Sequence, residues 1–537
     1  MNYNKKIMLV FLAIPILLSA CRSVQRADGS EASAGTEPAA ENTSISGQEE
    51  ILVWRMNLPV SMEETDMASQ LVGIWQEPLN ALLKEKGAGY QVEIELLGMD
   101  GEFAESDTSV ADELEALKAA GEKTDLISIR TPEQFDNLKG YYLMYPECIK
   151  RSLLMSLNLL LEEEKGETLK KAVTQTDLKR AECGGQVYGV SAVLPPSGYV
   201  AYSREQMQKY GVAEEELMAP LFENEKLLQK VQNLSGEAPY GILSGDVRRE
   251  LGLWITEPSE NLVLTKDGTF GNVTETPEFK ERLTKLLEWK EKGLLRILDG
   301  SQEEMCFAQQ GGSLGMYFSD QAYSGDLLVP VKTGADKESP VFLVPSQTQW
   351  DLAPYWGDVK QCIASWTKKQ ELAEDFLIRL MSDPDIANLI QYGRIGEEYT
   401  LEDGKVKVEK ATNIYLQLFG GQYTNPLITY PTRTMAKNKL EYAAKFHETY
   451  ESGIPDGFRF DPKPVIEQVV KTNQVFGNSS GSETAGKIIR LEIEDTKSAV
   501  ADITAELKAA GIDDVVEEAN RQLREWKLSK QKGQLEG

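Results

Sequence analysis

Residues 125–135 read Asp-Leu-Ile-Ser-Ile-Arg-Thr-Pro-Glu-Gln-Phe, a stretch that we predict to pass from a strand into a helix. The apolar run over 125–129 predicts the strand. Pro132 at a first helical position, followed by an acidic residue, predicts the helix start. A strand over 90–97 and a helix over 109–120 are predicted just before this stretch. Strand, helix and strand at this spacing are typical of βαβ units, which indicates a mostly parallel sheet covered by helices on both faces.

The same alternation continues in both directions along the chain. Upstream, a β-prone run at 51–55 precedes a helical stretch that ends near Lys86. Downstream, the pattern predicts strands at 187–192, 199–202, 239–243 and 315–318, a hairpin across 266–268, helices at 277–292 and 368–381, and two or three helices over 485–528. Residues beyond 50 are therefore predicted to be α/β, with an extra helical region at the C-terminal end.

The first 20 residues predict a secretory signal peptide. Lys5 and Lys6 precede an apolar run, Ile7 to Leu18, that is too short to span a bilayer comfortably. The sequence Leu-Ser-Ala-Cys at 18–21 resembles the bacterial lipobox, which implies a diacylglyceryl group on the sulfur of Cys21 and acyl chains such as palmitate in the membrane. An ordinary signal peptide with a chance cysteine is the alternative.

The composition of the chain predicts a flexible segment and argues against two classes of partner. Residues 22–49 are rich in Ser, Ala, Gly and Glu and contain hardly an apolar side chain larger than alanine, which predicts a flexible tether. The chain carries 57 Lys and Arg against 85 Asp and Glu, a net charge of −28. Binding to nucleic acid and adhesion to anionic lipid both need clustered positive charge, so neither is expected.

Cysteine spacing gives no indication of a metal centre. Cys148, Cys183, Cys306 and Cys362 are widely spaced, and the chain has a single histidine, so neither a metal nor another cofactor is expected. A disulfide among the four is possible, but the spacing does not assign it. Buried thiols are the favoured alternative, because a chain of this length does not need staples to fold.

Signals for catalysis are weak in this sequence. The single histidine, His447, lies in a helical stretch and is expected to be a surface side chain rather than a catalytic base. No Walker phosphate loop is present. The sequences Lys-Asp-Gly-Thr at 266–269 and Glu-Asp-Gly-Lys at 402–405 lack the alternating oxygen ligands of a calcium loop and are expected to be hairpin turns. Paired carboxylates of a glycosidase remain an alternative, because acidic residues are abundant.

Several blocks in order resemble the extracellular solute-binding proteins of carbohydrate-type ABC importers, family 1. Ser191 and Ser203 stand where that family usually has proline and asparagine. Two later blocks, 392–405 and 507–523, are similar to those of a long-chain lipoprotein subgroup. The other blocks that carry the resemblance are 125–135, 140–146, 185–190, 198–212, 307–317 and 363–377.

The resemblance implies two α/β lobes of the periplasmic-binding-protein type, with a hinge between them. The partition it suggests is a signal peptide at 1–20, a lipidated cysteine and tether at 21–49, a first lobe at 50–165 plus about 325–375, a second lobe at 166–324 plus about 376–480, and a C-terminal helical region at 481–537. A ligand would close between the lobes.

Ligands in open α/β sheets collect beyond the carboxyl ends of strands, so loops after predicted strands supply candidate contacts. Arg130 could instead pair with a surface carboxylate, and Asp246 could cap a helix beginning at Val247. Trp54 and Trp254 are expected to be packing residues. The aromatic residues at 323, 355 and 356 are chosen because the resemblance implies platforms for sugar rings there. The predicted ligand contacts are Arg55, Asn57, Arg130, Glu133, Asp246, Arg248, Tyr323, Tyr355 and Trp356.

The expected function is binding rather than catalysis. A monomeric lipoprotein, anchored on the extracytoplasmic face of a bacterial cell membrane, would capture an oligosaccharide and deliver it to the permease subunits of an ABC importer. A lipid-anchored surface enzyme acting on polysaccharide is one alternative. A sensor or adhesion lipoprotein with the same fold is another.

Overall fold

The computed structural model describes most of the chain beyond residue 49. All described residues belong to one compact unit, residues 49–537. Among them, no helix combines the length and apolar character needed to cross a bilayer. The described residues are 50–57, 65–97, 110–131, 144–192, 197–217, 221–252, 259–298, 314–320, 328–332, 338–345, 358–407, 416, 420–432, 438–449, 455, 458–477 and 481–536.

A five-stranded sheet organises the first part of the chain, and we call this sheet and the helices packed on it the first lobe. Its strands lie in the order β2-β1-β3-β15-β6. β1 pairs in parallel with both β2 and β3, whereas β15 runs antiparallel to β3 and to β6. The strands are β1 (Glu50–Asn57), β2 (Tyr90–Leu97), β3 (Leu126–Thr131), β6 (Gly189–Val190) and β15 (Asp358–Ile363).

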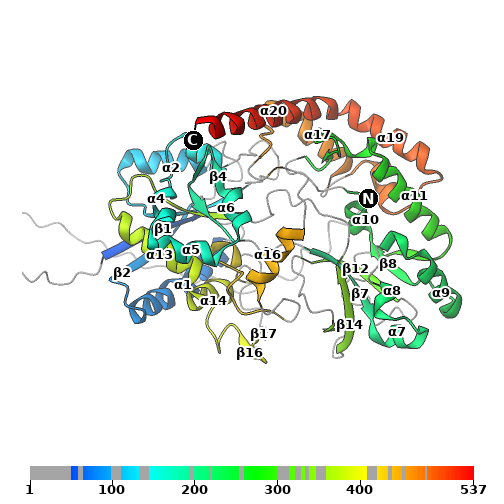
Figure 1. Cartoon of the computed structure of the whole chain (residues 1–537), viewed down its shortest axis with the longest axis horizontal. Helices are drawn as coiled ribbons and strands as arrows, with labels where there is room; N and C mark the ends of the chain where they lie inside the picture. The colour runs from blue at the N-terminus through cyan, green and yellow to red at the C-terminus, as the bar shows by residue number, and fades with distance from the viewer. Residues whose placement is uncertain are drawn as a thin grey trace, which may run out of the picture. The chain divides into compact units, whose positions relative to one another are not determined.

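Both faces of this sheet are covered by helices (Figure 1). Alternate side chains of a strand point to opposite faces. Leu52 and Trp54 of β1 therefore share one core with α1, α13 and α14, while Ile127 and Ile129 of β3 share another with α2 and α3. The helices of the first lobe are α1 (Thr65–Glu85), α2 (Val110–Ala120), α3 (Met144–Lys150), α4 (Asn158–Glu162), α5 (Glu164–Ala172), α6 (Gln175–Ala181), α13 (Gln370–Ser382), α14 (Pro384–Tyr392), η5 (Gly420–Tyr423) and α16 (Lys439–Thr449).

A six-stranded mixed sheet organises the second lobe, in the order β11-β8-β12-β7-β14-β13. β8 is parallel to β11 and β12, and β7 is antiparallel to β12 and β14. The strands are β7 (Ser197–Ser203), β8 (Tyr240–Leu243), β11 (Leu295–Leu298), β12 (Gly315–Asp320), β13 (Leu328–Lys332) and β14 (Glu338–Pro345). Its helices before the C-terminal region are α7 (Arg204–Tyr210), α8 (Glu214–Leu217), η2 (Leu221–Glu223), α9 (Glu225–Ser235), α10 (Ser244–Glu250), η3 (Val273–Glu275) and α11 (Pro277–Glu291).

The C-terminal helices complete the core of the second lobe. Ile503, Leu507 and Val515 are fully buried in the same cluster as residues of β8 and α11. Caps fix where these helices begin, since the side chains of Ser482 and Asp495 accept hydrogen bonds from backbone N–H groups of the first turn. The helices are η6 (Lys463–Val465), α17 (Ile466–Phe476), α18 (Glu483–Ile489), α19 (Thr496–Ala509) and α20 (Ile512–Glu536), and α17, α19 and α20 are labelled in Figure 1.

Three short hairpins stand apart from the two sheets, and two of them were predicted. β9 (Leu262–Leu264) pairs antiparallel with β10 (Phe270–Asn272), across the turn that contains Gly268. β16 (Thr400–Glu402) pairs antiparallel with β17 (Lys405–Lys407), and Asp403 and Gly404 in its turn have φ of 52° and 74°. These positive φ values are those that Asp-Gly hairpin turns require. The third hairpin joins β4 (Glu182–Cys183) to β5 (Gln186–Val187).

The structure allots several segments differently from the partition suggested by the sequence. β13 and β14 pair in the second sheet, although 325–345 was expected in the first lobe. Leu169, Leu389 and Tyr423 are buried in the first core, although their segments were expected in the second lobe. The helices beyond residue 481 share the second core instead of forming a separate region. Local alternation does not reveal which sheet a strand joins, because that depends on where the chain crosses between sheets.

Candidate functional site

The chain crosses between the two sheets three times. Residues 191–196 join β6 to β7, residues 346–357 join β14 to β15, and residues 450–457 lead from α16 to the second core. β15 begins at the carboxyl end of β3, because Asp358 pairs with Thr131. In the second sheet, β7 begins opposite Asp320, at the carboxyl end of β12. The first two crossings therefore connect the carboxyl edges of the two sheets.

The first crossing limits how far apart these edges can lie. Seven peptide steps separate Val190 at the end of β6 from Ser197 at the start of β7. A fully extended chain of that length spans at most about 25 Å. Since ligands of open α/β folds bind beyond the carboxyl ends of strands, the space bounded by these two edges is the candidate site.

Asn57 ends β1 at this edge and is one of the predicted contacts that the structure describes. It is buried, and its backbone carbonyl accepts a hydrogen bond from the Tyr423 hydroxyl at 2.6 Å. Tyr423 belongs to η5, whose neighbour Gln422 accepts a hydrogen bond from Gln361 Nε2 through its carbonyl at 3.3 Å. The 420–423 segment is thus fixed by hydrogen bonds to two strands of the first sheet.

A buried polar chain crosses the middle of the first sheet. Trp54 Nε1 donates to Ser128 Oγ at 2.8 Å, and Ser128 Oγ donates to Gln361 Oε1 at 2.5 Å. Trp54 has no exposed surface, and its ring meets Phe376 edge-on at 5.5 Å between centroids. The preference for Trp54 as a packing residue is confirmed.

Lys360 of β15 holds the start of the first crossing. Its side chain is 1% exposed, and its Nζ donates to Ser191 Oγ at 2.6 Å. The positive charge of Lys360 also acts on Asp177 in the capping box of α6. Asp177 accepts hydrogen bonds from the backbone N–H and the hydroxyl of Thr174. Burial raises the pKa of Asp177 to about 6, although those hydrogen bonds and the positive charge of Lys360 oppose the rise.

Arg55 is engaged in contacts inside the first lobe, away from the carboxyl edge. Its Nε donates to Thr124 Oγ1 at 2.9 Å and its Nη2 to the Lys123 carbonyl at 3.3 Å, both in the loop that leads into β3. Its Nη1 forms an ion pair with Glu95 on β2. The side chain thus runs back toward the amino end of the sheet, where these contacts give it a structural role, and its assignment as a ligand contact stays a prediction.

The structure also places Asp246 and Arg248 in α10. α10 begins at Ser244, so Asp246 is the third residue of the helix and not the cap of one that begins at Val247. Arg248 is buried, with Nη2 2.6 Å from Glu260 and 3.4 Å from the Phe476 carbonyl. Arg248 therefore ties α10 to the C-terminal helices of its own lobe, and its assignment as a ligand contact stays a prediction.

The remaining predicted residues receive no structural description of their side chains. For Arg130 the structure gives only the backbone, which pairs with Val359 near the end of β3. The residues that lie outside the described part of the chain are Cys21, Glu133, Tyr323, Tyr355, Trp356 and also Trp254.

Sequence reasoning overlooked the polar residues that lie inside the strands. Lys360 and Gln361 interrupt an otherwise apolar strand, and Ser128 does the same in β3. Buried polar side chains are expected only where they have partners. No strand was predicted over 358–363, but Ser128 lies inside the strand predicted at 125–129, where it was a usable signal of a hydrogen-bonded site; the search had been confined to loops.

A partly open hollow lies between the first lobe and the C-terminal segment. Its volume is about 290 Å³, and its wall combines aromatic, acidic and basic side chains. The lining residues are Tyr145, Pro146, Glu147, Lys150, Arg180, Glu182, Cys183, Arg459, Asp461, Lys463 and Trp526. It is distinct from the space at the carboxyl edges, because its walls are helices and the β4–β5 hairpin.

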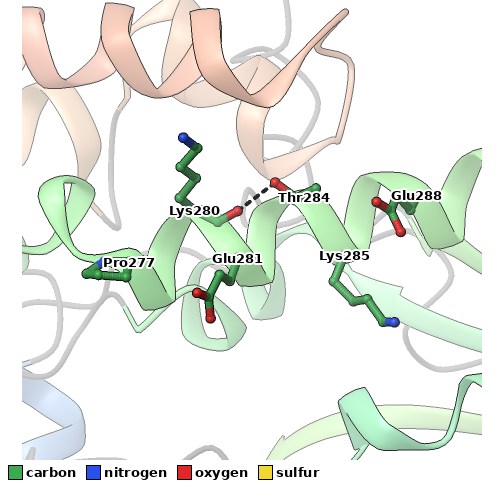
Figure 2. Close-up of a pocket in the computed structure, with 6 residues that line it drawn as sticks. All are labelled: Pro277, Lys280, Glu281, Thr284, Lys285 and Glu288. Carbon is green, nitrogen blue, oxygen red and sulfur yellow. Dashed lines mark hydrogen bonds between the residues drawn. The ribbon is translucent and has the colours of Figure 1, made fainter.

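A second hollow, of about 430 Å³, lies along α11. Figure 2 shows that its six lining residues, from Pro277 to Glu288, come from that one helix, with Thr284 Oγ1 donating to the Lys280 carbonyl at 2.8 Å. The backbone carbonyl of the preceding turn thus satisfies the threonine hydroxyl. This surface has the character of a solvated helix face.

Three of the five cysteines lie in the described part of the chain. Cys148, Cys183 and Cys362 are thiols, and Cys306 lies outside the described residues. In the described ranges, no group of three or more His, Cys, Asp or Glu side chains is arranged to hold a metal ion. The backbone of His447 lies in helix α16, as predicted.

We compared the sequence and the structure of this chain with those of known proteins. A family described as a domain of unknown function (DUF3502) matches residues 455–528. No curated protein matches the sequence. The N-glycan transport solute binding protein NgtS from Streptococcus pneumoniae is 17% identical and has a TM-score of 0.57, with 89% of this chain and 98% of that chain covered.

Two further solved structures are similar over comparable lengths. NgtS in complex with Man1GlcNAc is 18% identical with a TM-score of 0.48, covering 89% of this chain and 99% of that one. An extracellular solute-binding protein from Bifidobacterium longum subsp. infantis is 13% identical with a TM-score of 0.45, again covering 89% and 99%. The fold assignment rests on the NgtS structure with a TM-score of 0.57, and it confirms the predicted class: this chain has the two-lobed α/β fold of a solute-binding protein.

Proposed function

We propose that this chain is an extracytoplasmic binding protein that captures an oligosaccharide between its two lobes and delivers it to an ABC importer. The observation that carries the proposal is the fold shared with NgtS, a protein named for N-glycan transport, over 98% of that chain. The carboxyl edges of the two sheets, joined by the short crossing at 191–196, supply the place where such a ligand would bind.

The work of such a protein is done by binding free energy. A ligand that contacts both lobes favours the arrangement in which both sets of contacts are made. Hinge motion requires crossings that are few and anchored at their ends. The hydrogen bond from Lys360 to Ser191 provides such an anchor at the first crossing. In this proposal the chain itself is not an enzyme and acts as a monomer.

Membrane attachment is a separate part of the proposal. The lipobox-like sequence at 18–21 would place acyl chains on Cys21, and residues 22–49 would tether the lobes within reach of the permease subunits. Cys21→Ser should move the protein from the membrane fraction to the soluble fraction and abolish incorporation of labelled palmitate. Retention of the label in this variant would contradict the assignment.

Calorimetric titration of the full chain with a panel of oligosaccharides tests the binding role. At a ligand concentration of about 100 times Kd, saturable binding should stabilise the fold by about 2.7 kcal/mol, which a thermal-shift assay detects. Chromatography of the same mixtures should recover the glycans unchanged. Cleavage of a glycan would favour the surface enzyme, and binding confined to peptides would refute the carbohydrate assignment while leaving the fold intact.

A further inference from the structure

The C-terminal segment, residues 458–536, carries three basic side chains that we call the basic arm: Arg459, Lys463 and Lys530. Two hydrogen bonds clamp the 459–463 stretch to α20: Asp461 N donates to Gln522 Oε1 at 2.8 Å, and Gln522 Nε2 donates to the Asp461 carbonyl at 2.7 Å. These reciprocal bonds make the stretch and the helix move together.

Aromatic packing ties the basic arm to the second lobe. Trp526 of α20 meets Phe458 edge-on at 6.0 Å between centroids, and Phe458 packs on Phe270 of β10 at 5.7 Å. Lys530, one turn further along α20, lies 5.9 Å from the centre of the Trp526 ring. The backbone that carries the basic arm is therefore packed against the core of the second lobe, whereas the charged ends of its side chains contact the first lobe.

All three basic groups contact acceptors of the first lobe. Lys530 forms an ion pair with Glu182 of the β4–β5 hairpin. Lys463 Nζ lies 3.8 Å from Glu147 of α3, and Arg459 Nη2 donates to the carbonyl of Arg180 in α6 at 3.4 Å. Each contact has its donor on the C-terminal segment and its acceptor on the first lobe. The chain has a net charge of −28, so a contact surface whose donors are all basic side chains contrasts with the acidic composition of the whole chain.

The acceptors are held firmly on the first lobe. Glu147 also pairs with Arg151 at 2.9 Å. The residue before Glu182, Ala181, accepts a hydrogen bond through its carbonyl from the hydroxyl of the buried Tyr145 at 2.7 Å. Between the basic arm and these acceptors lies the hollow of about 290 Å³. The two surfaces are thus joined by polar contacts around a space, instead of by a close-packed apolar interface.

We propose that the basic arm and its acceptors Glu147, Arg180 and Glu182 form an ionic latch that holds the two lobes in the arrangement described here. The contacts are partly exposed, with the side chains of Glu182 and Lys530 at 33% and 35% accessibility. Exposed ion pairs each shift an equilibrium by up to about fivefold and weaken as salt screens them. The latch is therefore strong enough to bias the lobes and weak enough for a bound ligand to overcome.

The latch assigns a role to the C-terminal segment, in which residues 455–528 match a domain of unknown function. Its regulatory meaning rests on the proposed binding function, because a bias between lobe arrangements changes the apparent affinity of a ligand that prefers one of them. The latch itself is measurable without ligand.

Distances between spin labels on the two lobes of the full chain test the latch directly. Labels on ketone-bearing amino acids at Lys171 of α5 and Lys226 of α9, both exposed, avoid the native cysteines. Raising the ionic strength from about 0.01 M to about 1 M shortens the Debye length from 30 Å to 3 Å and should add a second population of distances. An unchanged distribution would overturn the proposal.

Charge reversal identifies the groups responsible. Glu182→Lys and Lys530→Glu should each raise the second population about fivefold at low salt, and the double variant should restore the wild-type distribution. Lys508→Glu is the matched control, since it makes the same charge change at a pair with Glu275 inside the second lobe and should leave the distances unchanged. A double variant without recovery, or a control as disruptive as Lys530→Glu, would overturn the latch. Failure of every oligosaccharide to bind would refute the proposed function alone.

Discussion

Lys439 is a buried cation in the first lobe, and replacing it should stabilise the protein in a pH-dependent way. The residue begins α16 and is 1% exposed. Its Nζ donates to Thr429 Oγ1 at 2.5 Å and to the Tyr430 carbonyl at 3.3 Å. Burial lowers the pKa of Lys439 from 10.5 to about 7. A positive charge at a helix N-terminus is unfavourable as well.

The sign and size of the effect follow from that pKa. The unfolded chain holds the Lys439 proton up to pH 10.5, whereas the folded chain releases it near pH 7, so the free energy of unfolding rises with pH between these values. Below pH 7 the burial of the charge costs the fold up to about 5 kcal/mol, at 1.36 kcal/mol per pKa unit. Lys439→Met removes this cost, together with two hydrogen bonds worth about 1 kcal/mol each.

Urea unfolding of Lys439→Met and wild type at several pH values measures the difference. The variant should be more stable by about 3 kcal/mol at pH 6, and its advantage should shrink as pH rises and reverse to a deficit of about 2 kcal/mol above pH 10.5, where only the loss of the two hydrogen bonds remains. Lys171→Met, at an exposed position of α5, should show no such trend. A stability difference for Lys439→Met that stays constant from pH 6 to pH 10 would refute the reasoning.

Three further predictions concern the first lobe. Gly189→Ala should destabilise it by about 1–3 kcal/mol in urea unfolding, because the added Cβ would lie 2.5 Å from Cys362 Sγ. Tyr423→Phe removes the hydrogen bond to the Asn57 carbonyl, so it should cost about 1 kcal/mol of stability and also weaken oligosaccharide binding in calorimetry. Burial raises the pKa of Asp177 from 3.8 to about 6, so between these pH values the folded chain holds a proton that the unfolded chain has lost. The free energy of unfolding of the wild type should therefore fall by up to about 3 kcal/mol as pH rises from 3.8 to about 6. The contribution of this site should be absent in Asp177→Asn, whose stability should not change with pH in this range.

Local sequence signals were sufficient for much of the secondary structure. The helix predicted at 277–292 begins at Pro277, where Thr276 accepts a hydrogen bond from the Phe279 N–H and proline needs no donor of its own. The strand predicted at 90–97 has those bounds. These elements depend on residues near one another in sequence, which is why a single sequence reveals them.

Long-range contacts explain what the sequence did not reveal. Arg248 was predicted to face a ligand because it follows strand β8, but Glu260 and the Phe476 carbonyl draw it into the second core. Arg55 was likewise predicted from its position near the end of a strand, and its side chain contacts Thr124 and Glu95 within the first lobe. A guanidinium reaches far from its own strand, so its partners are set by the tertiary fold and not by its position after a strand.

The distribution of polar residues along the strands of the first sheet supports a site at its carboxyl edge. β15 runs from this edge inward, and it reads Asp358, Val359, Lys360 and Gln361 before the apolar Cys362 and Ile363. β1 runs the other way, and its buried residues change from Leu52 and Val53 to a final Asn57.

Apolar residues such as Leu52 and Ile363 lie in the amino half of the sheet, where burial stabilises the fold, together with the buried polar Thr124 and Asp125, which hydrogen-bond to β1. The carboxyl half carries the buried Lys360, Gln361 and Asn57. Buried polar groups stabilise a fold less than apolar ones of the same size, and these three adjoin the edge where ligands of open α/β folds bind, so ligand binding is our explanation for their position. If that explanation holds, Lys360→Met should leave the protein folded and no less stable at neutral pH, while calorimetry shows weaker oligosaccharide binding, because Ser191 at the first crossing loses its anchor. A Lys360→Met variant that binds with wild-type affinity would show that this edge is polar for another reason.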